Sequence, residues 1–120
     1  MRLLGAWRIA REQNAGEDNP HAADNGYWFH ESHVVIGSAD AAWEWPIRLD
    51  ATTTPHAIDM WSDDPRQAFR DLGIWAETGG ILQICWGVRD SGLRPADFAS
   101  TPGNGWQLLE LVPSDEPEPT

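Results

Sequence analysis

Two histidines three residues apart, His30 and His33, have the types and spacing that come nearest to a metal site. The residues on either side, 27–29 and 34–36, are mostly aromatic or β-branched and predict a strand. Side chains three positions apart on a strand point to opposite faces, so the two imidazoles would not converge on one ion. Because a metal needs converging ligands, we expect neither a metal nor a cofactor here.

The other candidates for chemistry have simpler structural explanations. Cys85 lies inside an apolar segment, where a free thiol usually behaves as a small hydrophobe. Asp63 and Asp64 precede a proline and suit a turn or a cap, and Asp59 suits an ion pair with an arginine. The chain has no nucleophile elbow, phosphate-binding glycine loop or dinucleotide fingerprint. We therefore expect no enzyme, and a hydrolase that uses His30 and Asp59 is the remaining alternative.

The charge of the chain excludes two classes of partner. Eight arginines, no lysine and nineteen acids give a formal net charge of −11 over 120 residues. Binding of nucleic acids or of anionic membranes needs a basic face, which this composition does not supply. The single cysteine allows no internal disulfide, and the apolar segment 3–7 is too short for a signal peptide. We expect a soluble, cytoplasmic protein.

The elements that must position these residues are strands. Alternating apolar and polar residues over 43–50 predict a half-buried strand, and segments 72–77 and 80–86 predict a hairpin that turns at Gly79-Gly80. Weaker patterns predict further strands at 6–11, 27–36, 56–61 and 106–112. The one helical signal is Asp64-Pro65, which predicts one or two turns. Segments 12–25 and 89–105 read as long loops.

About seven short strands at hairpin spacing predict an all-β fold. We expect a small antiparallel up-and-down β-barrel over residues 1–112, with at most one or two short helical turns, because closure of a barrel removes edge strands. Residues 113–120 contain three acids, three prolines and no apolar anchor, and they predict a disordered acidic tail.

Several short segments together resemble a known family. Gly5-Ala6-Trp7 resembles the Gly-x-Trp that begins lipocalin barrels. With segments 55–60, 73–75, 82–85, 94–98 and 102–105, in this order and spacing, residues 3–112 resemble a family of small lipocalin-like domains of uncharacterised function that is abundant in planctomycete bacteria. The resemblance implies a lipocalin-type barrel and brings no catalytic residues. It also implies that Arg94 closes one barrel end by stacking on Trp7.

The eight tryptophans allow two explanations with different functional consequences. In the first, they line a pocket for a flat or apolar ligand; this set is Trp28, Trp43, Trp45, Trp61, Trp75 and Trp86. In the second, which we favour, they fill a barrel that is only just wide enough for its own side chains. Trp28 or Trp106, near loop ends, would then be exposed anchors for a protein partner.

Two hypotheses about function follow. The first is a non-catalytic binding protein whose acidic surface, including Asp63, Asp64 and Glu44, engages a basic protein partner. A concrete version is an intracellular immunity or antitoxin protein that covers the positively charged cleft of a toxin. The alternative is a carrier of a small apolar or aromatic ligand inside the barrel, with contacts from Trp28, Trp43, Trp45, Trp61 and Trp86.

Overall fold

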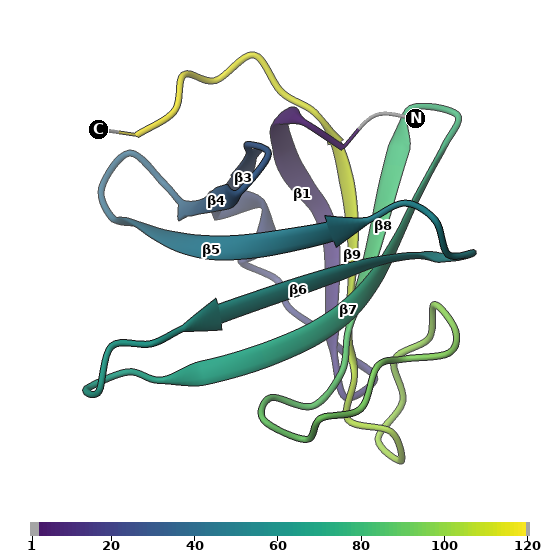
Figure 1. The fold of residues 1–120 in the computed structure, drawn as a ribbon. Helices are drawn as coiled ribbons and strands as arrows, with labels where there is room; N and C mark the ends of the chain where they lie inside the picture. Colours follow the sequence, from purple (N-terminus) through teal and green to yellow (C-terminus); the bar gives the residue numbers. More distant parts are fainter. Residues whose placement is uncertain (1–2, 120) are drawn as a thin grey trace.

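The protein is an all-β, antiparallel, closed eight-stranded barrel, as the sequence predicts (Figure 1). The structure is a computed structural model that describes residues 3–119. The barrel strands are β1 (Gly5–Asn14), β3 (Gly26–Phe29), β4 (His33–Gly37), β5 (Ala42–Asp50), β6 (His56–Ser62), β7 (Phe69–Thr78), β8 (Ile81–Trp86) and β9 (Gln107–Pro113). A short strand, β2 (Glu17–Asp18), pairs with the end of β1, and η1 (Ala22–Asp24) is a 3₁₀ turn.

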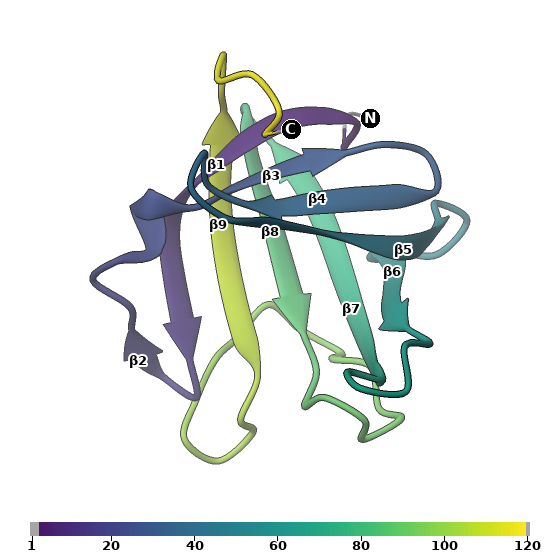
Figure 2. The same ribbon diagram turned by 90° about the vertical axis from the view of Figure 1, so that its left-hand side faces the viewer.

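The strands follow one another around the barrel in an up-and-down meander. Strand β1 pairs with β3, each of β3 to β8 pairs with the next strand, and β9 pairs back onto β1, which closes the wall (Figure 2). Strand β1 shifts its register between Ile9 and Arg11, where it bends along β9. Among residues 3–119 the only helical segment is η1, so no described helix has the length and apolar character needed to cross a bilayer.

The β7–β8 hairpin forms where the sequence predicts it. Its turn residues, Gly79 and Gly80, have φ angles of +62° and +84°, which only glycine adopts without strain. Glycine is needed for a different reason at Gly73, where an added Cβ would lie 2.7 Å from the Trp86 ring. The Trp86 side chain thus packs flat against the backbone of β7.

Three local predictions are wrong. Segment 12–25 is not one long loop, because β1 continues to Asn14, turns back into β2 and is followed by η1. Segment 27–36 is not one strand but the hairpin of β3 and β4, and the His30 amide donates to the His33 carbonyl across its turn (2.9 Å). Asp64 does cap a turn, since its carboxylate accepts from the Arg66 amide (2.9 Å), but no helix follows. Strand β7 begins instead at Phe69, because pairing with β6 buries that side chain inside the barrel.

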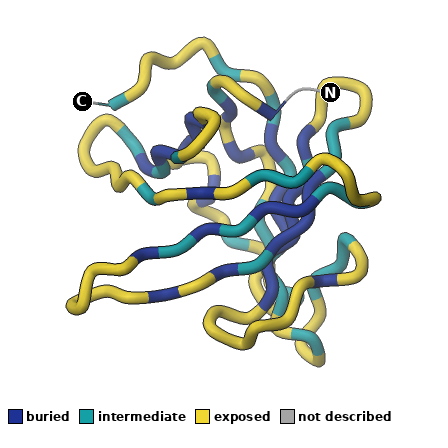
Figure 3. Tube along the Cα trace, in the orientation of Figure 1, coloured by how far each residue is buried: buried dark blue, intermediate teal, exposed yellow. Residues whose placement is uncertain are grey.

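The barrel interior is filled by large side chains, as the favoured explanation expects, but only three of the eight tryptophans belong to its buried core. Figure 3 shows the buried positions along the strands. Trp7, Trp75 and Trp86 are almost completely buried there. They pack with aliphatic and aromatic residues from every barrel strand, among them Ile9, Tyr27, Phe29, Val34, Ile47, Ile58, Phe69, Leu82, Ile84, Leu109 and Leu111.

The wall between β5 and β6 is paired over only part of its length. The ladder runs from Asp50 with Ala57, beside the turn, to Ile47 with Met60, and it stops there. The Ile47 amide donates to Ser32, on the β4 side, so the neighbouring residue, Pro46, faces β6. Proline has no N–H to donate, and the first half of β5 therefore continues without pairing to β6.

Candidate functional site

The clearest surface hollow lies between the C-terminal tail and the β4–β5 hairpin. Two adjoining hollows of about 220 and 280 Å³ share Ala39, Glu118 and Pro119 in their linings. We call them together the tail groove, lined by Trp28, Val35, residues 38–44 and residues 116–119. Figure 1 shows the tail running from the end of β9 toward this hairpin.

The tail groove is acidic on both sides. Asp40 and Glu44 line it from the hairpin, and Glu116 and Glu118 line it from the tail. None of the arginines among residues 3–119 contributes to either lining. Four acidic residues thus line two adjoining hollows in which no described arginine offsets their charge.

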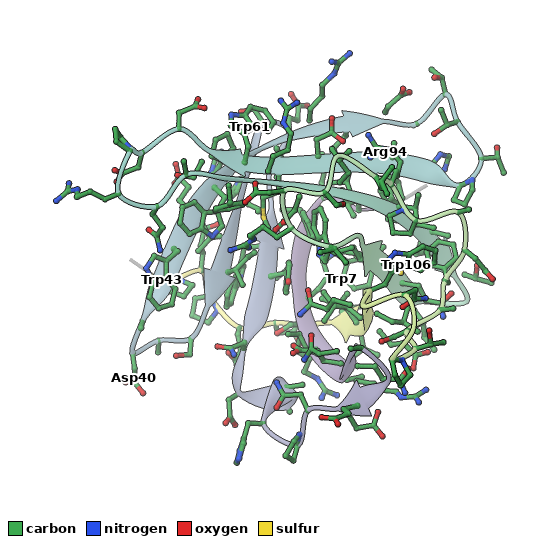
Figure 4. All side chains as sticks on the ribbon, turned by 90° about the horizontal axis from the view of Figure 1, so that it is seen from below. Trp7, Asp40, Trp43, Trp61, Arg94 and Trp106 are labelled. Atoms are coloured by element: carbon green, nitrogen blue, oxygen red, sulfur yellow. The ribbon has the colours of Figure 1, made fainter. Side chains whose placement is uncertain are left out.

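An exposed aromatic ring lies on the other face of β5 from Glu44. Trp43 lies on the inward-facing side of β5, opposite Ile36, but 53% of its surface is exposed. It lies beyond Pro46, in the part of β5 that does not pair with β6, so the barrel wall does not cover it. Figure 4 shows Trp43 and Asp40 on the same side of the molecule.

The tail is attached to the barrel at three points. The Ser114 amide donates to the Ala6 carbonyl (3.0 Å), the Trp28 indole N–H donates to the Glu116 carbonyl (3.0 Å), and the Glu118 carboxylate contacts the His30 imidazole. Trp28 faces outward because its neighbours on β3 face the core, and it is 5% exposed. The structure assigns residue 113 to β9 and brings tail residues, among them Pro117 and Pro119, into one lining with Trp28. The disorder expected for residues 113–120 stays a prediction.

The two histidines of the sequence motif do meet, contrary to the prediction. They flank the β3–β4 turn, so their rings face each other at 4.2 Å between centroids and 14° between planes. Glu44 Oε1 lies 3.8 Å from His33 Nε2, and His30 contacts Glu118. Among residues 3–119, no group of three or more such side chains is arranged to hold a metal ion.

The structure divides the five tryptophans of the carrier hypothesis between two faces. Trp43, Trp45 and Trp86 lie on the inward side of their strands, and Trp45 meets Phe69 edge to face at 5.0 Å. Trp28 and Trp61 lie on the outer side, because their strand neighbours point into the core. Those two do not line the interior, and the idea that Trp28 is an exposed anchor is wrong.

The acidic residues of the partner hypothesis lie in two places. Glu44 lines the tail groove, whereas Asp63 and Asp64 belong to the β6–β7 connection. Asp64 is engaged locally, since it caps the Arg66 amide and lies 3.7 Å from the Arg66 guanidinium. Of these three acids, only Glu44 belongs to the groove.

Arg94 does not stack on Trp7. Its guanidinium donates to the carbonyls of Gly73 (2.8 Å) and Ile58 (3.2 Å) and to the Asp59 carboxylate (2.6 Å), on the wall of β6 and β7. The loop after β8 folds back along the outside of that wall, and Figure 4 shows Arg94 apart from Trp7. Trp7 is buried inside and donates to the Leu3 carbonyl (2.8 Å).

The ion pair expected for Asp59 is therefore present, with Arg94 as its partner. His30 contacts His33 and Glu118 instead, so the structure does not bring the two residues of the hydrolase alternative together.

Sequence reasoning missed a polar layer inside the open end of the barrel. The Asp71 side chain is 8% exposed and faces inward, and Arg89 donates to both of its oxygens (2.8 and 3.1 Å). The same guanidinium lies 4.0 Å above the Phe69 ring, and hydrogen bonding to Asp71 raises the pKa of Arg89. The sequence could have predicted that Asp71 faces inward. It lies on the same side of β7 as Phe69, Gly73 and Trp75, because alternate residues of a strand share a face.

Tyr27 and Trp86 belong to the same layer. Burial, and secondarily the charge of Glu12, raise the pKa of Tyr27 well above its ordinary value. The Trp86 indole lies beside the Tyr27 hydroxyl, and hydrogen bonding between them opposes part of that rise. The indole nitrogen of Trp75 is buried without a hydrogen-bond acceptor among residues 3–119, so the interior holds a donor that a polar acceptor would satisfy.

Cys85 lies on the outer side of β8, buried beneath the loop that precedes β9. It packs with Ile74, Leu108, Phe98 and Trp106, and burial raises the pKa of its thiol. This environment fits the hydrophobic role that the sequence predicts.

Comparison of the chain with protein-family models, with curated proteins and with solved structures gave no match.

Proposed function

We propose that the protein is a non-catalytic binding protein whose acidic surface engages a basic protein partner. The observation that carries this proposal is the tail groove, where Asp40, Glu44, Glu116 and Glu118 line two adjoining hollows with no described arginine in either lining. A net charge of −11 adds long-range attraction for a basic surface and speeds association.

The chemistry of the groove favours a particular kind of contact. Carboxylates on two sides bind a cationic side chain, and a guanidinium suits them because its planar fork donates to carboxylates in more than one direction. Small residues, Ala39, Ala41 and Ala42, line the groove beside them. The occupant that fits is an arginine-bearing segment of the partner.

The concrete version is an immunity or antitoxin protein that acts in the cytoplasm. It would cover the positively charged cleft of a toxin, and its acidic groove would hold basic side chains of that cleft. Mixing the purified protein with the purified product of the neighbouring gene at low salt tests this version. A complex that weakens as salt rises is expected, and no complex at low salt would contradict it.

A matched pair of variants tests the groove itself. Asp40→Asn with Glu44→Gln removes two groove charges, and Glu17→Gln with Asp97→Asn removes two exposed charges elsewhere. We expect the Kd for a short oligo-arginine peptide to rise about tenfold in the first variant and to change little in the second. Equal weakening in both would mean that only the net charge matters, and the groove would not be the site.

A second candidate function is carriage of a small ligand inside the barrel. The buried indole N–H of Trp75, which has no acceptor among residues 3–119, favours it. An aromatic ligand that carries a carbonyl or hydroxyl oxygen would satisfy this donor. Quenching of tryptophan fluorescence by such a ligand, lost in Trp75→Phe, is the expected result, and no quenching would contradict this function.

We also propose membership of the family of small lipocalin-like domains. The order and spacing of the segments that begin with Gly5-Ala6-Trp7 support it.

A further inference from the structure

We propose that the C-terminal tail is a pH-dependent clasp on the tail groove. Protonated His30 binds the Glu118 carboxylate and so keeps the tail, which forms one wall of the groove, on the barrel. Loss of the His30 proton releases the tail. The effect on a basic partner rests on the proposed function, whereas the clasp is a property of the isolated protein.

The three attachments of the tail differ in their response to pH. The bonds of Ser114 to Ala6 and of Trp28 to the Glu116 carbonyl join neutral groups that do not titrate near neutrality. The contact of His30 with Glu118 is an ion pair only while the imidazole is protonated. It is also the attachment nearest the end of the described chain, so it decides whether residues 117–119 stay on the barrel.

The tail needs this attachment because it is acidic and lies against an acidic surface. Glu116 and Glu118 share the groove with Asp40 and Glu44, so like charges repel across it. With no arginine among residues 3–119 in the lining, the imidazoles beside the groove are the cations available to offset that repulsion.

Four titratable groups are arranged in a row beside the groove. His30 contacts Glu118 from the tail, stacks on His33 of β4 at 4.2 Å, and His33 Nε2 lies 3.8 Å from Glu44 of β5. Two protonated rings at this separation repel each other, but each has its own carboxylate. When both rings are neutral, Glu118 and Glu44 lose their cationic neighbours and only the repulsion between the carboxylates remains.

The sign of the pH dependence follows from proton linkage. Docking of the tail is coupled to a proton on the imidazole, so within the range where Glu118 is ionised the docked fraction falls as the pH rises. One linked proton changes the docking equilibrium by at most about tenfold per pH unit. Histidines titrate between about pH 5 and 8, which sets the window for the change.

The indole N–H of Trp28 reports on docking in the isolated protein. Its NMR resonance, assigned with Trp28→Phe, should shift with pH through the histidine window, because its acceptor is the tail carbonyl of Glu116. The backbone amide of Ser114, bonded to Ala6, serves as a reference that should move little. A Trp28 resonance that does not respond to pH in this window overturns the clasp.

Two matched pairs of variants separate the clasp from a general charge effect. Glu118→Gln and Glu116→Gln each remove one tail charge, but only the Glu118 side chain contacts His30. His30→Gln and His21→Gln each remove one histidine, and His21 lies beside η1, outside the lining of the groove. We expect Glu118→Gln and His30→Gln to lose most of the pH response, with a remainder from His33 and Glu44, and the two controls to retain it. Equal responses within either pair overturn the proposal.

Binding of a short oligo-arginine peptide separates this proposal from the proposed function. If the clasp regulates the partner site, wild-type affinity falls across the histidine window and Glu118→Gln binds weakly at every pH. If docking of the tail depends on pH but the protein binds no peptide, the clasp is supported and the proposed function is contradicted. Peptide affinity that is the same in wild type and Glu118→Gln overturns the regulation, because the tail wall then contributes nothing.

Discussion

The Arg89 guanidinium is bonded to both carboxylate oxygens of Asp71, with Nη2 2.8 Å from Oδ2 and Nε 3.1 Å from Oδ1. Asp71 faces the barrel interior, whereas Arg89 reaches it from the loop after β8 and remains 57% exposed. The pair thus holds the loop after β8 over this end of the barrel. It also gives the buried Asp71 carboxylate a counter-charge.

Arg89→Ala should therefore cost about 2–3 kcal/mol of the free energy of unfolding, because it leaves the Asp71 carboxylate buried and unpaired. Arg70→Ala, one residue before Asp71 and exposed, should change it by less than about 0.5 kcal/mol. Urea denaturation measures both. Asp71→Asn combined with Arg89→Ala should recover part of the lost free energy of unfolding. A double variant that is less stable than Arg89→Ala alone would contradict this account.

Tyr27 should not ionise in the folded protein at about pH 10, where an ordinary tyrosine does. Burial, and the nearby charge of Glu12, raise its pKa, and it is the only tyrosine in the chain, so phenolate absorbance reports on it alone. The unfolded state releases this proton first, so stability should fall as the pH rises above about 10. A normal phenolate titration with the fold intact, followed by circular dichroism, would refute this.

Arg94→Ala should destabilise the protein by about 2 kcal/mol, because it removes an ion pair to Asp59 and two hydrogen bonds to backbone carbonyls. Arg48→Ala is the control, since Arg48 is exposed and lies in the same surface hollow. Thermal unfolding of both variants measures the difference. Equal midpoints would show that the contacts of Arg94 contribute nothing.

Cys85 should react with thiol reagents only when the protein opens. Its side chain is buried under Phe98 and Trp106, and burial raises the pKa of the thiol, so little thiolate forms near neutral pH. Phe98→Ala should speed labelling at least about tenfold by loosening this cover, whereas Phe69→Leu, inside the barrel, should have a smaller effect. Fast labelling of the wild type under native conditions would contradict the burial.

The fold class could be predicted from the sequence because alternation and turn chemistry are local. Residues 43–50 alternate between the two faces of β5, and Gly79-Gly80 supply the positive φ angles of the β7–β8 turn. The β3–β4 turn was missed because residues 30–32 contain no glycine, proline or asparagine. A helix was predicted at Asp64 because the cap is local, but the pairing of β7 with β6 is not.

The acidity and the absence of lysine belong to the composition, and no fold is needed to find them. Only the tertiary structure decided where that charge gathers. Glu44 and Glu118 are far apart in the sequence, and they share a groove because Trp28, turned outward by strand parity, and His30, turned toward His33 by the hairpin, hold the tail on the barrel. Arg94 lies on the outer wall and Arg89 at the open end for a similar reason: the path of the loop after β8 positions both, and long-range packing determines that path.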